Sequence, residues 1–306
     1  MAHDSAGLRW VFGTGYSAAH ESLEDYTDER VAGMVRAAAG LPGLEVKLRP
    51  QIPGTEMKVL GFPIGGQVAE RYRVGRTFLV GDAAHWVPPT GGLGANTGIQ
   101  DAHNLGWKLA WVLRDRAGSA LLDTYHDERR PVGLLTMQQA LARFGARMQS
   151  DGSSAIIDYP SIIYGYQYRS SAVLGAEEET APLRPQELAG QPGTRAPHVP
   201  VTLEGRRVST LDLYGSRFVL LAGPEGSSWV SAARAVTERP GVDAYRFGVE
   251  LAEAEGAAAH GIGTDGALLV RPDGFVAWRS TPGAGRPEHG NRVAELEGVL
   301  TAGLSR

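Results

Sequence analysis

The sequence predicts an α/β protein made of several parts, and three observations support this class. Short apolar runs typical of strands alternate with longer stretches in which apolar residues recur at helical spacing. The 41 glycines and 18 prolines gather at a few places that separate these runs. With 306 residues and 42% hydrophobic side chains, the chain is long enough for about two packed domains.

The composition excludes several classes of function. Thirty Lys and Arg against 34 Asp and Glu give a net charge of −4 without a basic block, which argues against nucleic-acid and membrane partners. There is no cysteine, so disulfides, thiolate metal sites and cysteine nucleophiles are absent, and redox chemistry would need a cofactor. The start of the chain lacks a signal-peptide pattern and no long apolar run follows, which predicts a cytoplasmic protein.

The first part, residues 1–69, is expected to form part of a sheet with one helix. Residues 21–39 carry acids early and apolar residues at helical spacing, and Gly40 is a helix stop. Three stretches have the composition of strands: Leu8–Phe12, Leu44–Leu48 and Met57–Phe62.

The second part, residues 70–180, is expected to form a strand, a loop and a pair of helices. Thr77–Val80 is an apolar run typical of a buried strand, and the loop of residues 81–94 follows it. Apolar residues from Ala102 to Leu113 then predict a long helix, and residues 124 to about 148 predict a second.

The last part follows a stretch rich in Pro, Gly, Glu and Arg, which predicts a linker at residues 181–200. Residues 201–306 then show the order β-α-β followed by β-β-α, which is the order of a thioredoxin-like fold. A Pro-Asp-Gly turn at residues 272–274 predicts a hairpin between the last two strands. Gly223–Trp229 stands where a Cys-x-x-Cys pair would be, so dithiol chemistry is excluded. The expected elements are strands at 218–222, 242–248, 267–270 and 275–278 and helices at 228–239 and 292–300.

The segment Gly81–Ala102 is the strongest candidate for a functional site. A carboxylate, Asp82, ends an apolar run, and a double proline and several glycines then lead into the long helix. A helix start offers unpaired N–H donors and partial positive charge, and glycines let a ligand approach the main chain. The pattern therefore predicts a site for a flat, negatively charged ligand, with a simple tight turn as the alternative.

This segment resembles the C-terminal portion of FAD-dependent aromatic-ring hydroxylases. The resemblance continues through Asn104–Ala110, Leu122–Tyr125, Glu128–Val132 and the thioredoxin-like tail. These enzymes are single-component flavoprotein monooxygenases similar to p-hydroxybenzoate and phenol hydroxylases, with a branch that tailors polyketides. The resemblance implies part of a p-hydroxybenzoate hydroxylase-like FAD domain, a remnant of the substrate sheet and a thioredoxin-like C-terminal domain.

The resemblance also implies residue roles. Gly81 and Asp82 would bind the ribityl part of FAD. Pro88 and Pro89 would be the catalytic residues, walling the flavin ring and placing a main-chain carbonyl near the substrate. NAD(P)H would reduce the flavin, and oxygen would then be transferred to a small aromatic substrate, a polyketide or a phenol; no metal is implied. The backbone at Gly94, Ala95 and Asn96 would face the anionic edge of the flavin, and Gly92 and Leu93 would also bind the cofactor.

One expected part of the family pattern is missing. Family members begin with a βαβ unit whose Gly-x-Gly-x-x-Gly motif holds the FAD pyrophosphate. Here Gly13–Ala19 only approximates this motif, and the acids that follow at Glu21 and Glu24 would repel a pyrophosphate. The chain is therefore expected to be the C-terminal portion of such an enzyme.

Three interpretations follow from this departure. In the first, the chain is a split or truncated hydroxylase whose N-terminal half comes from a partner chain or has been lost. In the second, it is a flavin-independent cyclase or binding protein for a polyketide-like intermediate. In the third, it is a silent binding or dimerisation module. The intact loop favours the first, because a chain that no longer met flavin would not need Asp82 and the glycine-rich helix start. A homo-oligomer is left open.

Overall fold

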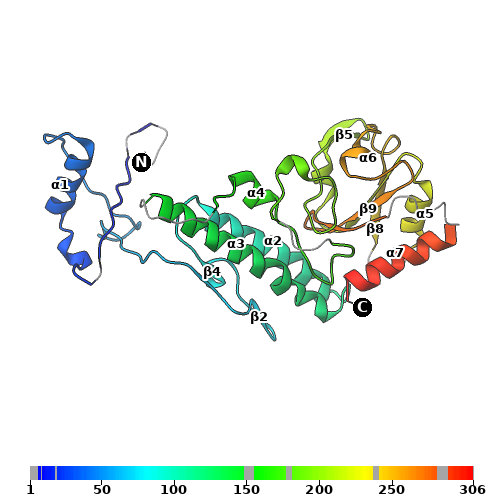
Figure 1. Cartoon of the computed structure of the whole chain (residues 1–306), viewed down its shortest axis with the longest axis horizontal. Helices are drawn as coiled ribbons and strands as arrows, with labels where there is room; N and C mark the ends of the chain where they lie inside the picture. The colour runs from blue at the N-terminus through cyan, green and yellow to red at the C-terminus, as the bar shows by residue number, and fades with distance from the viewer. Residues whose placement is uncertain are drawn as a thin grey trace. The chain divides into compact units, whose positions relative to one another are not determined.

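The computed structural model describes residues 6–7, 9–17, 19–147, 155–176, 181–236, 241–280 and 289–305. The chain forms two compact units, Met1–Pro63 and Ile64–Arg306, and each is described by itself (Figure 1).

The first unit contains one α-helix, α1 (Asp28–Ala39), preceded by the short 3-10 helix η1 (Leu23–Asp25). The Thr27 side chain caps α1 by accepting a hydrogen bond from the Arg30 amide, which sets the start of the helix well inside the predicted 21–39 range. The helix ends at Gly40, the predicted stop, whose φ of 66° is readily available only to glycine.

The strands predicted for the first part are wrong for the residues that the structure describes. Residues 9–12, 44–48 and 57–62 belong to no strand, and Leu8 lies outside the described residues. A strand needs a partner for its backbone hydrogen bonds. Among the described residues, no backbone hydrogen bond joins 44–48 to 57–62; the Gln51 amide, which lies between them, donates to the Met57 oxygen at 2.7 Å. Residues 44–48 and 57–62 therefore form no ladder with each other.

The second unit begins with short strands. β1 (Gln67–Val68) pairs antiparallel with β4 (His85–Trp86), and β2 (Arg73–Val74) pairs antiparallel with β3 (Thr77–Phe78). The prediction of a buried strand at residues 77–80 is therefore wrong. Its first two residues form half of a small hairpin, and no residue of the run is fully buried.

Two long helices lie side by side next to these strands, α2 (Leu93–Leu113) and α3 (Thr124–Arg147) (Figure 1). They run antiparallel, because Thr97 contacts Thr136 whereas Lys108, further along α2, contacts Glu128, earlier in α3. The two predicted helices are confirmed; Met148 lies outside the described residues. Shorter elements nearby are η2 (Gly81–Ala83), η3 (Ser119–Leu122) and α4 (Tyr159–Tyr164).

The C-terminal part is built on a four-stranded sheet in the order β10-β9-β7-β8, with β7 and β8 parallel and the other neighbours antiparallel. The strands follow one another in the predicted order, and the last two form the predicted hairpin, whose turn ends at Gly274. The bounds are β7 (Phe218–Ala222), β8 (Val242–Arg246), β9 (Ala267–Val270), β10 (Val276–Arg279), α5 (Ser227–Ala235), α6 (Gly256–Ala259) and α7 (His289–Gly303).

The sheet is buried on both faces, because alternate residues of a strand point to opposite sides. Phe218 and Leu220 pack with α5, α7 and the end of α2, including Trp107 and Trp111. Val219 and Leu221 pack on the other side with residues of α6 and of strand β5. The end of α2 is thus part of the C-terminal core.

The stretch predicted as a linker lies against this sheet. It contains η4 (Pro185–Glu187), and the Gly193 amide donates to Val276 of β10 at 2.8 Å. A hairpin that the sequence did not reveal follows, formed by β5 (Pro200–Leu203) and β6 (Arg206–Ser209), and leads into η5 (Thr210–Leu213). None of the helices in the described ranges has the length and apolar character needed to cross a membrane.

Candidate functional site

The candidate site lies where the loop of residues 81–92, here called the flavin loop, meets the start of α2. Gly91 and Gly92 have φ values of 86° and 62°, which turn the chain sharply into the helix. Asp82 and Pro89 are exposed on this loop, whereas Pro88 is buried. Thr90 anchors the loop to α3 by donating a hydrogen bond to the Ala140 carbonyl at 2.5 Å.

The first turn of α2 has free hydrogen-bond donors. Gly92 precedes the helix and has no side chain to cap it. Among the residues described, none accepts a hydrogen bond from the backbone amides of Gly94 and Ala95. Ala95 and Asn96 are exposed, and the Asn96 side chain donates to the Gly92 carbonyl at 2.9 Å. The uncapped turn therefore presents N–H groups and the positive end of the helix dipole.

The structure brings the predicted site residues together at this junction, but they differ in how accessible they are to a ligand. The Leu93 side chain is buried, so this residue can contact a ligand only through its backbone. The Gly81 amide already donates to the Asp101 carboxylate at 3.1 Å. Asp82, Pro89, Gly92, Ala95 and Asn96 are all exposed, and Gly94 is partly so.

Glycines allow the loop to lie directly on the helix. A methyl group added at Gly98 of α2 would lie 3.0 Å from Gly81 Cα, and one added at Gly94 would lie 3.1 Å from Val87 Cγ2. One added at Gly91 would lie 3.3 Å from the Tyr159 ring. Larger residues at Gly94 or Gly98 would push the loop away from α2, and one at Gly91 would meet Tyr159 of α4.

A buried polar group that the sequence reasoning missed supports the loop. The Asp101 side chain, fully buried on α2, accepts from Arg129 Nε at 2.7 Å and lies 2.6 Å from His85 Nε2. One signal could have revealed it. Four polar residues recur on one face of an otherwise apolar helix: Thr97, Asp101, Asn104 and Lys108.

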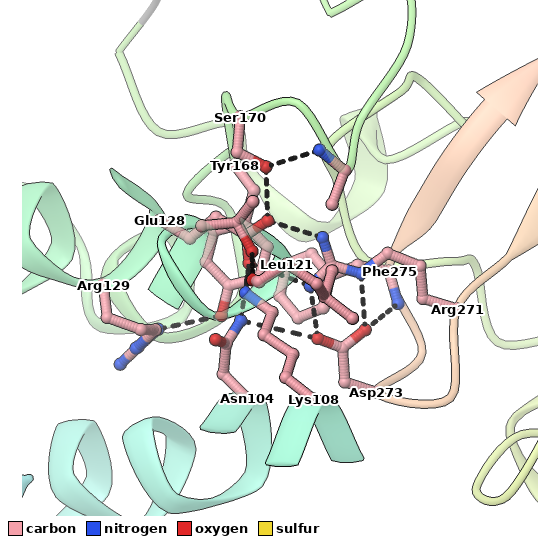
Figure 2. Close-up of polar contacts among 12 residues, drawn as sticks. Asn104, Lys108, Leu121, Glu128, Arg129, Tyr168, Ser170, Arg271, Asp273 and Phe275 are labelled. Carbon is pink, nitrogen blue, oxygen red and sulfur yellow. Dashed lines mark hydrogen bonds and ion pairs between the residues drawn. The ribbon is translucent and has the colours of Figure 1, made fainter. Parts of the chain in front are cut away.

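A second buried group joins α2 and α3 to the C-terminal sheet (Figure 2). Glu128 accepts from Arg271 at 2.6 and 2.9 Å and from Lys108 at 2.7 Å. Asn104 and Ser170 also donate to Glu128, at 2.7 and 2.6 Å.

Asp273 completes this group by accepting from Arg271 Nε at 3.0 Å, so two cations face two anions. Burial alone would raise the pKa of Glu128, but Arg271 and Lys108 hold it well below its usual range. Burial lowers the pKa of Lys108 to about 8, against the attraction of Glu128. Arg271 and Asp273 come from the turn between β9 and β10, so this group fastens the C-terminal part to the helix pair.

Comparison with known families identifies two domains. Residues 3–140 match the FAD binding domain family, and residues 189–305 match the family of aromatic-ring hydroxylase C-terminal domains. The chain belongs to the FAD-dependent aromatic-ring hydroxylases. This confirms the resemblance noted from the residues of the flavin loop.

Individual members of this hydroxylase family are similar along most of the chain. Tetracenomycin A2 monooxygenase-dioxygenase of Streptomyces glaucescens is 45% identical over 89% of this chain and 48% of its own length. Aklavinone 12-hydroxylase of Streptomyces purpurascens is 41% identical over 94% and 52%. The structure of aklavinone-11 hydroxylase with FAD and aklavinone is 39% identical, with a TM-score of 0.83 over 94% of this chain and 53% of that one.

The chain thus spans about half the length of the hydroxylases that it matches. The predicted fold class, an FAD hydroxylase domain with a separate C-terminal domain, is confirmed by the two domain matches and the structural similarity. FAD as the cofactor is confirmed at the level of the family. These comparisons give no support to a flavin-independent cyclase or binding protein.

Proposed function

We propose that this chain forms the ring-facing part of an FAD-dependent, NAD(P)H-linked monooxygenase that hydroxylates an aromatic polyketide or phenolic compound. The observation that carries the proposal is the uncapped start of α2 behind the left-handed Gly91–Gly92 bend, with the exposed Asp82 carboxylate on the same loop. Relatives named as hydroxylases or monooxygenases of tetracenomycin and aklavinone support the substrate class.

The residues present fit a flavin. The free amides of Gly94 and Ala95, with that of Asn96 beside them, can donate to the electron-rich edge of the flavin ring, where the helix dipole stabilises negative charge. Asp82 can accept from the ribityl hydroxyls, and Gly81 places it at the start of the loop. Gly92 and Leu93 contribute backbone alone. When bound, FAD reduced by NAD(P)H supplies the oxygen-transfer chemistry.

The prolines shape the substrate side of the loop. Pro89 is exposed and can form a wall for the flavin ring, and the buried Pro88 stiffens the backbone whose carbonyl would face the substrate. Both roles are positional: they orient the two reactants and keep water from the ring.

We assign the parts of the chain different roles in the reaction. We infer that residues 70–180 contact the flavin ring and that the thioredoxin-like residues 201–306 support them. Residues 1–69 would contribute to the substrate domain and 181–200 would connect the parts. The unit that holds the FAD pyrophosphate would come from the remainder of the relatives' length, in the same or a partner chain, within the cytoplasm. The match over about half of each relative supports a contribution from the remaining half.

Flavin retention tests the proposal. The purified protein, mixed with FAD and passed through gel filtration, is expected to keep oxidised-flavin absorption bands, and Asp82→Ala is expected to weaken them. Asp265→Ala, which removes an exposed carboxylate of the C-terminal part, is the matched control and should behave as the wild type. Equal retention by Asp82→Ala, or a wild-type protein whose addition leaves the absorption spectrum of FAD unchanged at every FAD concentration, would contradict the proposal.

A further inference from the structure

The Asp101 carboxylate joins the flavin loop to both long helices. Its Oδ2 atom accepts from the Gly81 amide at 3.1 Å and lies 2.6 Å from His85 Nε2, so it holds the start of the loop and strand β4. Its Oδ1 atom accepts from Arg129 Nε of α3 at 2.7 Å. The side chains of Asp101, His85 and Arg129 are fully buried. A buried carboxylate depends on these partners, because water does not replace them.

Arg129 is itself held in place from two further directions. Its Nη2 atom donates to the Thr97 carbonyl of α2 at 3.1 Å, and its Nη1 atom donates to the Tyr168 hydroxyl at 3.1 Å. The guanidinium group is planar and rigid, so fixing its Nη atoms also fixes the direction in which Nε meets Asp101.

Tyr168 connects Arg129 to the C-terminal part (Figure 2). Its ring stacks on Phe275 with centroids 4.1 Å apart, and the Arg271 guanidinium lies 5.3 Å from the ring centroid. Phe275 and Arg271 flank the turn between β9 and β10, and Arg271 is also paired with Glu128, the neighbour of Arg129 in sequence. A continuous set of buried contacts therefore runs from this turn to the Gly81 amide.

We propose that Asp101 is a positioning residue for the flavin loop and that the C-terminal domain supports it through Tyr168 and Arg129. This gives the domain, which lacks redox cysteines, a role at the cofactor site. The support is indirect. The C-terminal domain positions Tyr168 and through it Arg129, and Arg129 positions the Asp101 carboxylate that accepts from the Gly81 amide. The consequence for FAD rests on the proposed function, whereas the support of the loop does not.

Two variants test this support at different strengths. Tyr168→Phe removes the hydroxyl that accepts from Arg129 but keeps the stacked ring, so the fold should be preserved. Asp101→Asn keeps the size of the side chain and replaces one acceptor with a donor that faces the Gly81 amide. The matched control is Tyr166→Phe, because Tyr166 also packs on Phe275 but its hydroxyl contacts Gln100 and Arg195 instead.

The first measurement is amide hydrogen exchange in the flavin-free protein, with the Gly81 amide compared with that of Leu220 in the buried strand β7. One net hydrogen bond corresponds to about a two- to twelve-fold change in an equilibrium. Tyr168→Phe should therefore speed exchange at Gly81 by roughly that factor and leave Leu220 unchanged, and Asp101→Asn should have the larger effect. Tyr166→Phe should change neither.

The inference is overturned if Tyr168→Phe leaves Gly81 exchange unchanged. It is also overturned if Gly81 and Leu220 accelerate together, which would show only a global loss of stability, or if Tyr166→Phe has the same effect as Tyr168→Phe.

FAD titration followed by flavin absorbance is the second measurement. The affinity for FAD should be lower in Tyr168→Phe than in the wild type and lowest in Asp101→Asn. Faster Gly81 exchange without FAD binding by any protein would contradict the proposed function and would still support the positioning of the loop.

Discussion

Replacing Glu128 by Gln should be one of the most damaging single changes in the helix pair. The Glu128 side chain is fully buried and accepts from both Arg271 and Lys108. In the wild type, these two cations are balanced by Glu128 and Asp273. The glutamine removes one negative charge, so the buried group changes from neutral to a net charge of +1, and the amide NH₂ would face a donor.

Removing one member of a buried ion pair typically costs about 3–5 kcal/mol, because the remaining charge is left without compensation. This is a large share of the roughly 5–15 kcal/mol by which domains are stable. For a unit of this size, about 2–4 °C of melting temperature is lost per kcal/mol, so Glu128→Gln should melt about 6–20 °C lower. Adding Lys108→Met removes the surplus charge and should recover part of the loss.

Urea denaturation followed by tryptophan fluorescence measures this effect, since Trp107 lies next to the group. Glu187→Gln is the matched control, because its partner Arg184 is 63% exposed and exposed pairs contribute only about 0–1 kcal/mol. A Glu128→Gln protein within about 1 kcal/mol of the wild type would refute the view that this group fastens the C-terminal part to α2 and α3.

Further predictions concern pH and the helix surface. The folded pKa of Lys108 is about 8, against 10.5 for a free lysine, so the unfolded state binds more protons between these values. Lys108 should therefore make the free energy of unfolding rise from pH 8 to 10.5, and the Lys108→Met variant should lack that rise. If the unfolding free energies of the two proteins, measured with urea, change with pH in parallel, the prediction is contradicted. Gly98→Ala, whose methyl would meet Gly81, should destabilise by about 1–3 kcal/mol. Gly106 is on the exposed face of the same helix, and a methyl group added there would have no atom within 4 Å, so Gly106→Ala should stabilise the protein by about 0.5–1 kcal/mol in thermal unfolding. Equal effects of Gly98→Ala and Gly106→Ala would contradict the close approach of loop and helix.

The sequence predicted the features that depend on local pattern. The long helices, the glycine bend before α2 and the order of elements in the C-terminal sheet follow from apolar spacing, from glycines and from the Pro-Asp-Gly turn. The exposed Asp82 and the free helix start could also be predicted, because both depend on residues close together in the chain.

Features that depend on distant partners could not be predicted in this way. The extended stretches before Pro63 have strand composition, but composition does not supply the neighbour that a strand needs. Lys108 and Glu128 are residue types that are normally exposed, and their burial is explained by their pairing with each other and by the contact of Glu128 with Arg271, far along the chain. The β5–β6 hairpin was not predicted although its signal is local: Val201, Leu203 and Val208 alternate with polar residues on either side of a two-residue turn.

A crystal structure of the protein soaked with FAD tests the central claim most directly. The account predicts that the flavin ring lies at the start of α2, with the Gly94 or Ala95 amide within hydrogen-bonding distance of its N1–C2=O edge and Asp82 near the ribityl chain. Flavin bound elsewhere, or those amides paired with the protein's own carbonyl groups so that no ring fits, would contradict it.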